Sequence, residues 1–136
     1  MIREALLSRY LSLLGVDPAP PSAAHLSRLV TAQLIRVPFE NISKLYLRRT
    51  LGAGFIPTLS EHLDGIERSN FGGTCYANNP YFCELLRFLG YDATLCGADM
   101  SNPDEIEKMI MDAEKAFGRV DIIVNNAGIP SSSYFL

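Results

Sequence analysis

The feature that most constrains the fold is a well-capped helical segment in the C-terminal third of the chain. Asn102 is suited to the N-cap, Pro103 to the first helical position and Glu105 to a capping box. Gly118 ends the pattern. Between these signals the apolar side chains recur at helical spacing, at Ile106, Met109, Ile110, Ala113 and Phe117. The sequence therefore predicts an amphipathic helix over residues 103–117.

Short apolar stretches flank this helix on both sides. DATLCGA (92–98) and VDIIV (120–124) are predicted strands. The second has no polar alternation, which is typical of a strand buried on both faces of a parallel sheet. A strand, a helix and a parallel strand form a β-α-β unit with a right-handed crossover. Residues 92–124 are thus predicted to be a partial α/β unit, because two strands are too few for an independent sheet.

The residues before this unit carry helix signals and no clear strand. The expected helices are residues 2–14, with Ile2, Leu6, Tyr10, Leu13 and Leu14 on one face; a helix after Ser22, with Leu26, Leu29, Val30 and Leu34 inward; a short helix from Thr58 or Ser60, with Leu63 and Ile66; and residues 81–89, closed by Gly90. The predicted fold class is α+β, with a helical N-terminal part followed by the partial β-α-β unit.

Length, charge and cysteine content narrow the function classes. The 136 residues suit one domain, or one domain and part of another, and with a net charge of −3 no nucleic-acid partner is expected. Residues 1–50 carry a net charge of +4 and residues 99–121 a net charge of −4, which indicates a change of domain or a solvated helix face. No membrane span or signal peptide is expected, and three cysteines predict free thiols in a reducing cytoplasm.

The stretch FGGTCYANN (71–79) contains the candidate nucleophile, Cys75. Gly72 and Gly73 allow a tight turn whose amides approach a bound ligand, and Thr74 leads into a helix. The partial positive charge at a helix start favours a thiolate, and free amides there can hold an oxyanion in acyl transfer. The alternative is a small buried residue at a loop-to-helix junction, the environment expected for Cys83.

Three segments of the sequence resemble the arylamine N-acetyltransferases. RYLSLLGV is similar to the opening helix of that family, VPFENIS to its Pro-Phe-Glu-Asn signature, and FGGTCYANN to its Arg-Gly-Gly-x-Cys-x-Glu-x-Asn motif. The resemblance covers residues 1 to about 104 and implies a helical first domain over residues 1–97. It implies an acetyl-cysteine at Cys75, with acetyl-CoA as donor and an arylamine or hydrazine as acceptor. Gly72, Gly73 and Thr74 would then lie near the acyl-CoA.

The chain departs from that family in its motif and in its catalytic triad. Phe71 replaces the usual Arg, Ala77 replaces the usual Glu, and Pro80 follows where the helix should continue. The family places the triad His and Asp after the Cys, whereas His25 and His62 both precede it. His25 is expected at a surface or boundary position, and His62 is expected to be solvated in an acidic helix. The transferase is therefore predicted to be incomplete and inactive.

From about residue 97 the chain resembles the short-chain dehydrogenases instead. GADMSNPDEIEKMIMDAEKAFGRVDIIVNNAGIP is similar to the central segment of a 3-hydroxybutyrate-dehydrogenase-like member. The resemblance places Asp99 near the adenine of the cofactor. It places the NNAG motif, which includes Asn125, Ala127 and Gly128, in the groove that binds the nicotinamide cofactor. Residues 98–136 would be a Rossmann-like fragment that does not bind NAD, because the glycine-rich phosphate turn and the catalytic Tyr-x-x-x-Lys pair are missing.

Three hypotheses follow from these two resemblances. The first is an arylamine N-acetyltransferase-like protein joined to a dehydrogenase segment, a chimera with a seam in GADMSNPD. The second is a fragment of an NAD-dependent dehydrogenase, and the third is a catalytically silent chimera that only binds or self-associates. No metal site is predicted.

Overall fold

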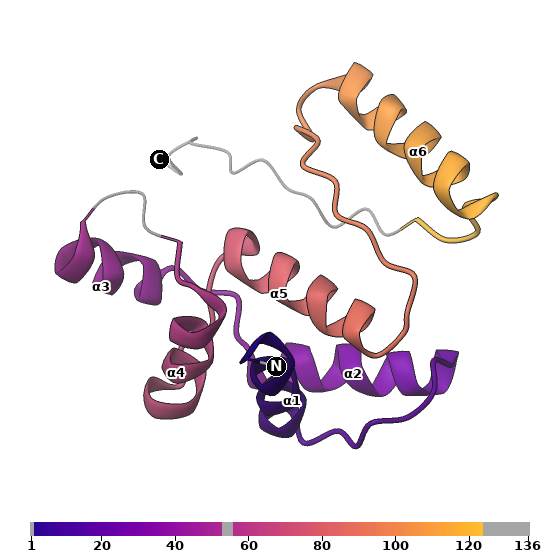
Figure 1. The fold of residues 1–136 in the computed structure, drawn as a ribbon. Coiled ribbons are helices and arrows are strands. Elements are labelled where there is room, and N and C mark those ends of the chain that lie inside the picture. The colour runs from indigo at the N-terminus through magenta and orange to yellow at the C-terminus, as the bar shows by residue number, and fades with distance from the viewer. Residues whose placement is uncertain (1, 53–55, 124–136) are drawn as a thin grey trace, which may run out of the picture. The chain divides into compact units, whose positions relative to one another are not determined.

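The computed structural model describes residues 2–52 and 56–123, and these form six helices (Figure 1). The helices are α1 (Ile2–Leu14), α2 (Ala23–Arg36), α3 (Ile42–Leu51), α4 (Leu59–Ser69), α5 (Cys75–Phe88) and α6 (Pro103–Phe117). The chain divides into two compact units, Met1–Leu95 and Cys96–Leu136. The first unit contains α1 to α5, and the second contains α6.

The predicted α+β class with a Rossmann-like β-α-β unit is wrong, because the described residues contain helices and no strand. Residues 92–98 and 120–123 have no regular structure, and residue 124 lies outside the described part. The physical reason is that a strand satisfies its backbone groups only through neighbouring strands, and the sequence offers two short ones. The nearest approach to a sheet in the described residues is an isolated parallel bridge between Phe39 and Gly73.

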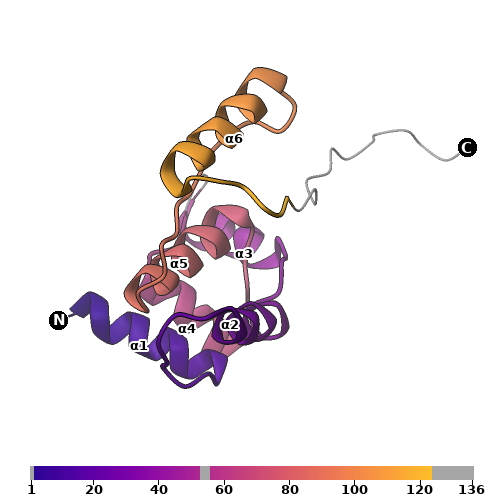
Figure 2. The ribbon, with the colours of Figure 1, turned by 90° about the vertical axis from the view of Figure 1, so that its right-hand side faces the viewer.

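The core of the first unit is built around α1, which packs against α2, α4 and α5 (Figure 2). Its fully buried side chains are Tyr10, Leu29, Leu59, Leu63, Ile66, Leu85 and His25. The Tyr10 hydroxyl donates a 2.7 Å hydrogen bond to Oε1 of Gln33, so a buried polar group of α1 and one of α2 pair with each other. This core fixes both α4 and α5 through their packing on α1, and the candidate site lies between the end of α4 and the start of α5.

Several helix boundaries are confirmed, because the signals that set them are local. The Ser22 side chain accepts the amide of His25 and caps α2, and Thr58 forms a full capping box with Glu61 at the start of α4. Gly90 has φ +88°, a left-handed conformation that ends α5 and that glycine adopts without strain.

The inward faces of α1 and α2 differ from the prediction. Ile2 is exposed on α1, whereas Leu7 and Leu11 are buried. On α2, Leu34 is 74% exposed and the buried positions are His25, Leu29 and Gln33. Of the residues predicted to face inward on α2, Leu29 is buried and Leu26 half-buried, whereas Val30 and Leu34 are exposed, because the buried face also includes the polar side chains of His25 and Gln33.

Helix α6 spans the predicted residues, but its N-terminal capping differs in detail. Oδ1 of Asn102 accepts the amide of Asp104 at 3.1 Å, and Oε2 of Glu105 accepts the amide of Asp99 at 2.8 Å. Glu105 therefore does not form the reciprocal capping box; its carboxylate instead accepts a hydrogen bond from the backbone of the preceding turn. No residue of α6 is buried, and its apolar face is at most half-buried.

No described helix is long and apolar enough to cross a membrane.

Candidate functional site

Cys75 is the first residue of α5, directly after the turn made by Gly72, Gly73 and Thr74. Its thiol is free and its side chain is exposed. Thr74 is the N-cap residue but makes no side-chain capping bond. Among the described residues the amides of Cys75 and Tyr76 have no hydrogen-bond partner and are available to a ligand, whereas the amide of Ala77 donates to the carbonyl of Thr74 at 3.0 Å. Pro80 is accommodated inside α5, and the helix continues to Phe88.

The segment VPFEN holds the glycine turn in place. The amide of Gly73 donates to the carbonyl of Pro38 at 3.2 Å, and the amide of Glu40 donates to the carbonyl of Gly73 at 3.2 Å. Nδ2 of Asn78 donates to the same Gly73 carbonyl at 2.9 Å. Two segments about 35 residues apart in sequence thus fix the conformation of the turn before Cys75.

Glu40 links this turn to α3. Its Oε1 accepts the amide of Gly72 at 3.0 Å, and its Oε2 accepts the amide of Ser43 at 2.8 Å. Burial alone would raise the pKa of Glu40, but hydrogen bonds from Ser43, Gly72 and Ile42 outweigh it and hold the pKa below the ordinary 4.5. The carboxylate therefore caps α3, since Asn41 makes no side-chain cap bond there.

Replacing this carboxylate tests the link. Glu40→Gln is expected to lower the free energy of unfolding by about 1–2 kcal/mol, because an amide nitrogen cannot accept the second backbone N–H. Because the pKa of Glu40 is depressed, its contribution is present above pH 4.5 and is lost as pH falls through the lower folded value. Urea unfolding at pH 7 and below pH 4 measures both. An equal difference between wild type and variant at the two pH values would contradict this role.

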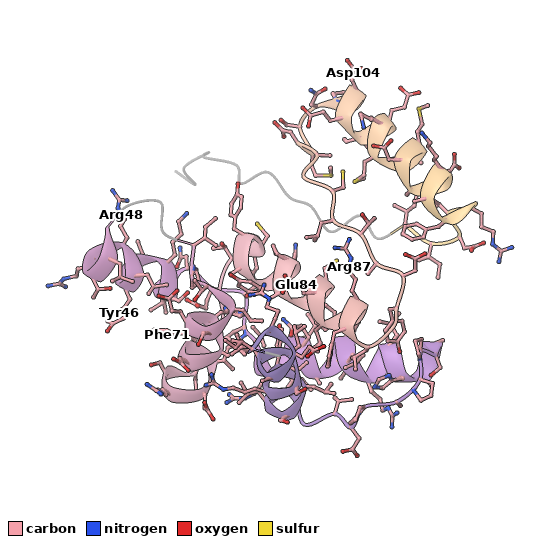
Figure 3. The ribbon with its side chains drawn as sticks, viewed as in Figure 1. Tyr46, Arg48, Phe71, Glu84, Arg87 and Asp104 are labelled. Atoms are coloured by element: carbon pink, nitrogen blue, oxygen red, sulfur yellow. The ribbon has the colours of Figure 1, made fainter. Side chains whose placement is uncertain are left out.

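A cavity of about 460 Å³ lies between α3, α4 and the glycine turn. Tyr46 and Phe71 form part of its wall, with their ring centroids 5.7 Å apart. Figure 3 labels these two side chains. Gly72, Gly73 and His62 also line it. The cavity therefore reaches the same turn that presents Cys75.

His62 lies on the buried face of α4 and not in solvent, so the predicted solvated position is wrong. It is 3% exposed, its ring is 5.3 Å from that of Tyr81, and it meets the ring of Tyr10 edge-on. Burial lowers the pKa of His62 to about 4, so the imidazole is neutral at pH 7. Its Nε2 has no hydrogen-bond partner.

His25 is also buried, against the prediction of a surface or boundary position. Its Nε2 lies 3.2 Å from the carbonyl of Asp17, and its Nδ1 lies 3.1 Å from the Tyr91 hydroxyl. Both ring nitrogens are engaged, so His25 joins the start of α2 to the chain beyond α5.

The thiol of Cys75 has no hydrogen-bonded histidine or carboxylate among the described residues. Sequence reasoning missed Glu40, His62 and Asn78 as parts of this region. The signal for His62 was its spacing, since Leu59, His62 and Ile66 recur on one face of α4. Glu40 and Asn78 act on backbone groups distant in sequence, and no local pattern reveals such contacts.

The dinucleotide residues predicted in the second unit are only partly described. Oδ1 of Asp99 accepts hydrogen bonds from the amide and hydroxyl of Ser101, and these lower its pKa. Asn125, Ala127 and Gly128 lie outside the described residues. In residues 2–52 and 56–123, no group of three His, Cys, Asp or Glu side chains is placed to hold a metal ion.

A helical unit that presents a cysteine at the start of a helix, after a braced glycine turn, defines a candidate acyl-transfer site. Residues 22–122 match a family model described as N-acetyltransferase. This match covers more than half of the chain, so the chain belongs to the arylamine N-acetyltransferase family. The match continues beyond residue 104, where the resemblance was expected to end, and includes α6.

Two curated relatives carry the second resemblance. The chain is 43% identical over 53 residues to an L-rhamnose 1-dehydrogenase (NAD(P)(+)) of Azotobacter vinelandii, which covers 39% of this chain and 21% of that protein. It is 42% identical over 45 residues to a short-chain type dehydrogenase/reductase of Picea abies, which covers 33% and 17%. The chain thus spans about a fifth of the length of these relatives. No solved structure matches the chain.

Proposed function

We propose that the protein takes an acetyl group from acetyl-CoA onto Cys75 and transfers it to an arylamine only very slowly. The observation that carries the proposal is the position of Cys75, exposed at the first residue of α5 behind the turn that Glu40 and Asn78 brace. Membership of the N-acetyltransferase family supports acetyl-CoA as the donor.

In the first step the Cys75 sulfur, as a thiolate, attacks the thioester carbonyl carbon of acetyl-CoA. A new carbon–sulfur bond forms to Cys75, the bond to the coenzyme sulfur breaks, and the coenzyme leaves as a thiolate that takes up a proton. The free amides at the start of α5 would stabilise the oxyanion between these events. In the second step an amine nitrogen attacks the acetyl-cysteine, loses a proton and releases the Cys75 thiol.

Mass spectrometry of the protein after incubation with acetyl-CoA tests the first step. We expect the mass of one acetyl group on the peptide that contains Cys75. The Cys75→Ser variant should lose this adduct, whereas Cys96→Ser, which removes another exposed cysteine, should keep it. If the wild type gains no acetyl group, the proposal fails and the catalytically silent, self-associating species becomes the better account.

Steady-state transfer to a simple aniline is expected to be negligible. No base contacts the thiol in the described residues, and general-base assistance is typically worth about 10²–10⁴-fold. A spectrophotometric assay with acetyl-CoA and aniline measures the rate against Cys75→Ala. Turnover well above that variant would contradict the prediction.

We propose that residues 1–97 and residues 98–136 derive from two different families. We also expect that the chain does not bind NAD with micromolar affinity. The pyrophosphate of NAD needs a glycine turn at a helix N-terminus, and the FGG turn of this chain is occupied by contacts with Pro38 and Glu40. Calorimetric titration with NAD measures this. One saturable site would contradict the prediction and favour the dehydrogenase-fragment hypothesis.

A further inference from the structure

We infer that the cavity between α3, α4 and the glycine turn binds a small hydroxyaromatic carboxylate, with its ring against Tyr46 and Phe71, its hydroxyl on His62 and its carboxylate at a basic rim. This site adjoins the thiol, since Thr74 and Tyr76 line the cavity on either side of Cys75, but Cys75 itself is not among the lining residues. Three features of the cavity carry the inference, and each selects one part of the ligand.

The floor of the cavity holds a polar atom without a partner. His62 lines the cavity and its side chain is only 3% exposed, yet its Nε2 has no hydrogen-bond partner in the part of the chain that the structure describes. A buried polar atom left unpaired is costly, so a ligand group that pairs with it gains the full benefit of the bond. A neutral imidazole nitrogen donates or accepts according to its tautomer, and a hydroxyl group can serve either.

The wall of the cavity selects the body of the ligand. Tyr46 and Phe71 meet with their ring planes inclined by 54°, and Ile56 and Pro57 add apolar surface. Gly73 lines the cavity without a side chain, and a Cβ there would lie 3.0 Å from Oδ1 of Asn78 and 3.3 Å from the Cβ of Ala77, so the turn is closely packed on that side. Aromatic walls of this kind favour a flat ring.

The rim selects the charge of the ligand. Lys44, Arg48 and Arg68 line the cavity and are exposed. Among the described residues Lys44 and Arg48 have no ion-pair partner, whereas Arg68 lies near Asp64 and helps to lower the pKa of that carboxylate. The two acidic residues that line it are already engaged, since Glu61 caps α4 through Thr58 and Asp64 pairs with Arg9 at 2.8 Å. The unpaired charge at the rim is therefore positive, and a carboxylate complements it.

Calorimetric titration of the full chain with 4-hydroxybenzoate tests the inference. We expect one saturable site, with binding weakened about tenfold or more for 4-hydroxybenzamide, which lacks the charge, and for benzoate, which lacks the hydroxyl. The affinity should also fall as salt rises, because the rim is exposed. No saturation at millimolar ligand, or equal affinity for the three compounds, would overturn the inference.

Two sets of variants locate the site. Lys44→Gln with Arg68→Gln removes two cavity charges, and Arg28→Gln with Arg49→Gln removes two charges that do not line the cavity. Only the first pair should weaken the binding of 4-hydroxybenzoate, by about tenfold or more, and it should leave the binding of the uncharged 4-hydroxybenzamide unchanged. Cys75→Ser should bind as the wild type does, which separates this inference from the proposed acetyl transfer. Equal weakening of 4-hydroxybenzoate binding by both double variants would mean that the overall charge attracts the ligand and that the cavity does not bind it.

Discussion

Lowering the pH from 6.5 to 4 is expected to reduce the free energy of unfolding by about 3 kcal/mol through His62 alone. The unfolded chain binds a proton on this imidazole near pH 6.5, whereas burial in the folded chain delays binding until about pH 4. Because the unfolded state holds more protons in this window, it gains stability relative to the folded state as pH falls. The full contribution of neutral His62 is present above pH 6.5.

Urea unfolding at intervals between pH 7 and pH 4.5 measures most of this effect, since about 2 kcal/mol of the loss falls above pH 4.5. The carboxylates with lowered pKa values, such as Glu40, titrate below that range. The His62→Asn variant should be less stable at pH 7 but should show a much flatter pH dependence. Parallel curves for wild type and variant would contradict a buried neutral His62.

The second large effect is expected at Gly72. The Gly72→Ala variant should lose at least about 3 kcal/mol of unfolding free energy, because its Cβ would lie 1.8 Å from the carbonyl oxygen of Pro38. A backbone atom cannot rotate away as a side chain does, so the bridge between Phe39 and Gly73 would have to open. Thermal unfolding followed by circular dichroism measures the loss.

Gly97→Ala is the matched control for this substitution. A Cβ at Gly97 meets nothing within 4 Å, so the same chemical change should leave the melting temperature nearly unchanged. If Gly72→Ala has the same melting temperature as the wild type, the glycine turn does not pack on VPFEN as described. The hydrogen bonds that fix the position of Cys75 would then be wrong.

The helices were predictable where their signals are local, and the strands were not. Ser22, Thr58 and Asn102 mark their helix starts through bonds that span two or three residues. The stretches 92–98 and 120–123 have strand-like composition, but a sheet requires partners from elsewhere in the chain. Helix α3 was not predicted. Its apolar residues Ile42 and Leu45 are exposed, so their spacing does not mark a buried helix face.

The candidate site was predictable at its centre but not in its surroundings. The glycine pair and Cys75 form one continuous motif, and sequence places the cysteine correctly near a helix start. His62 was misjudged because its neighbours Glu61 and Asp64 are acidic, although residues one and two positions away point in other directions on a helix. The resemblance to two families was confirmed by the comparisons, whereas the roles assigned to individual residues remain predictions.

The most direct test of the central claim compares two exposed cysteines within one molecule. Peptide mass spectrometry at short times after addition of acetyl-CoA gives the ratio of acetylation at Cys75 to that at Cys96. In the folded protein we expect a ratio of at least about ten, because only Cys75 has free helix amides behind a fixed turn. In urea the ratio should approach one. Equal acetylation of the two cysteines in the folded protein would contradict the account.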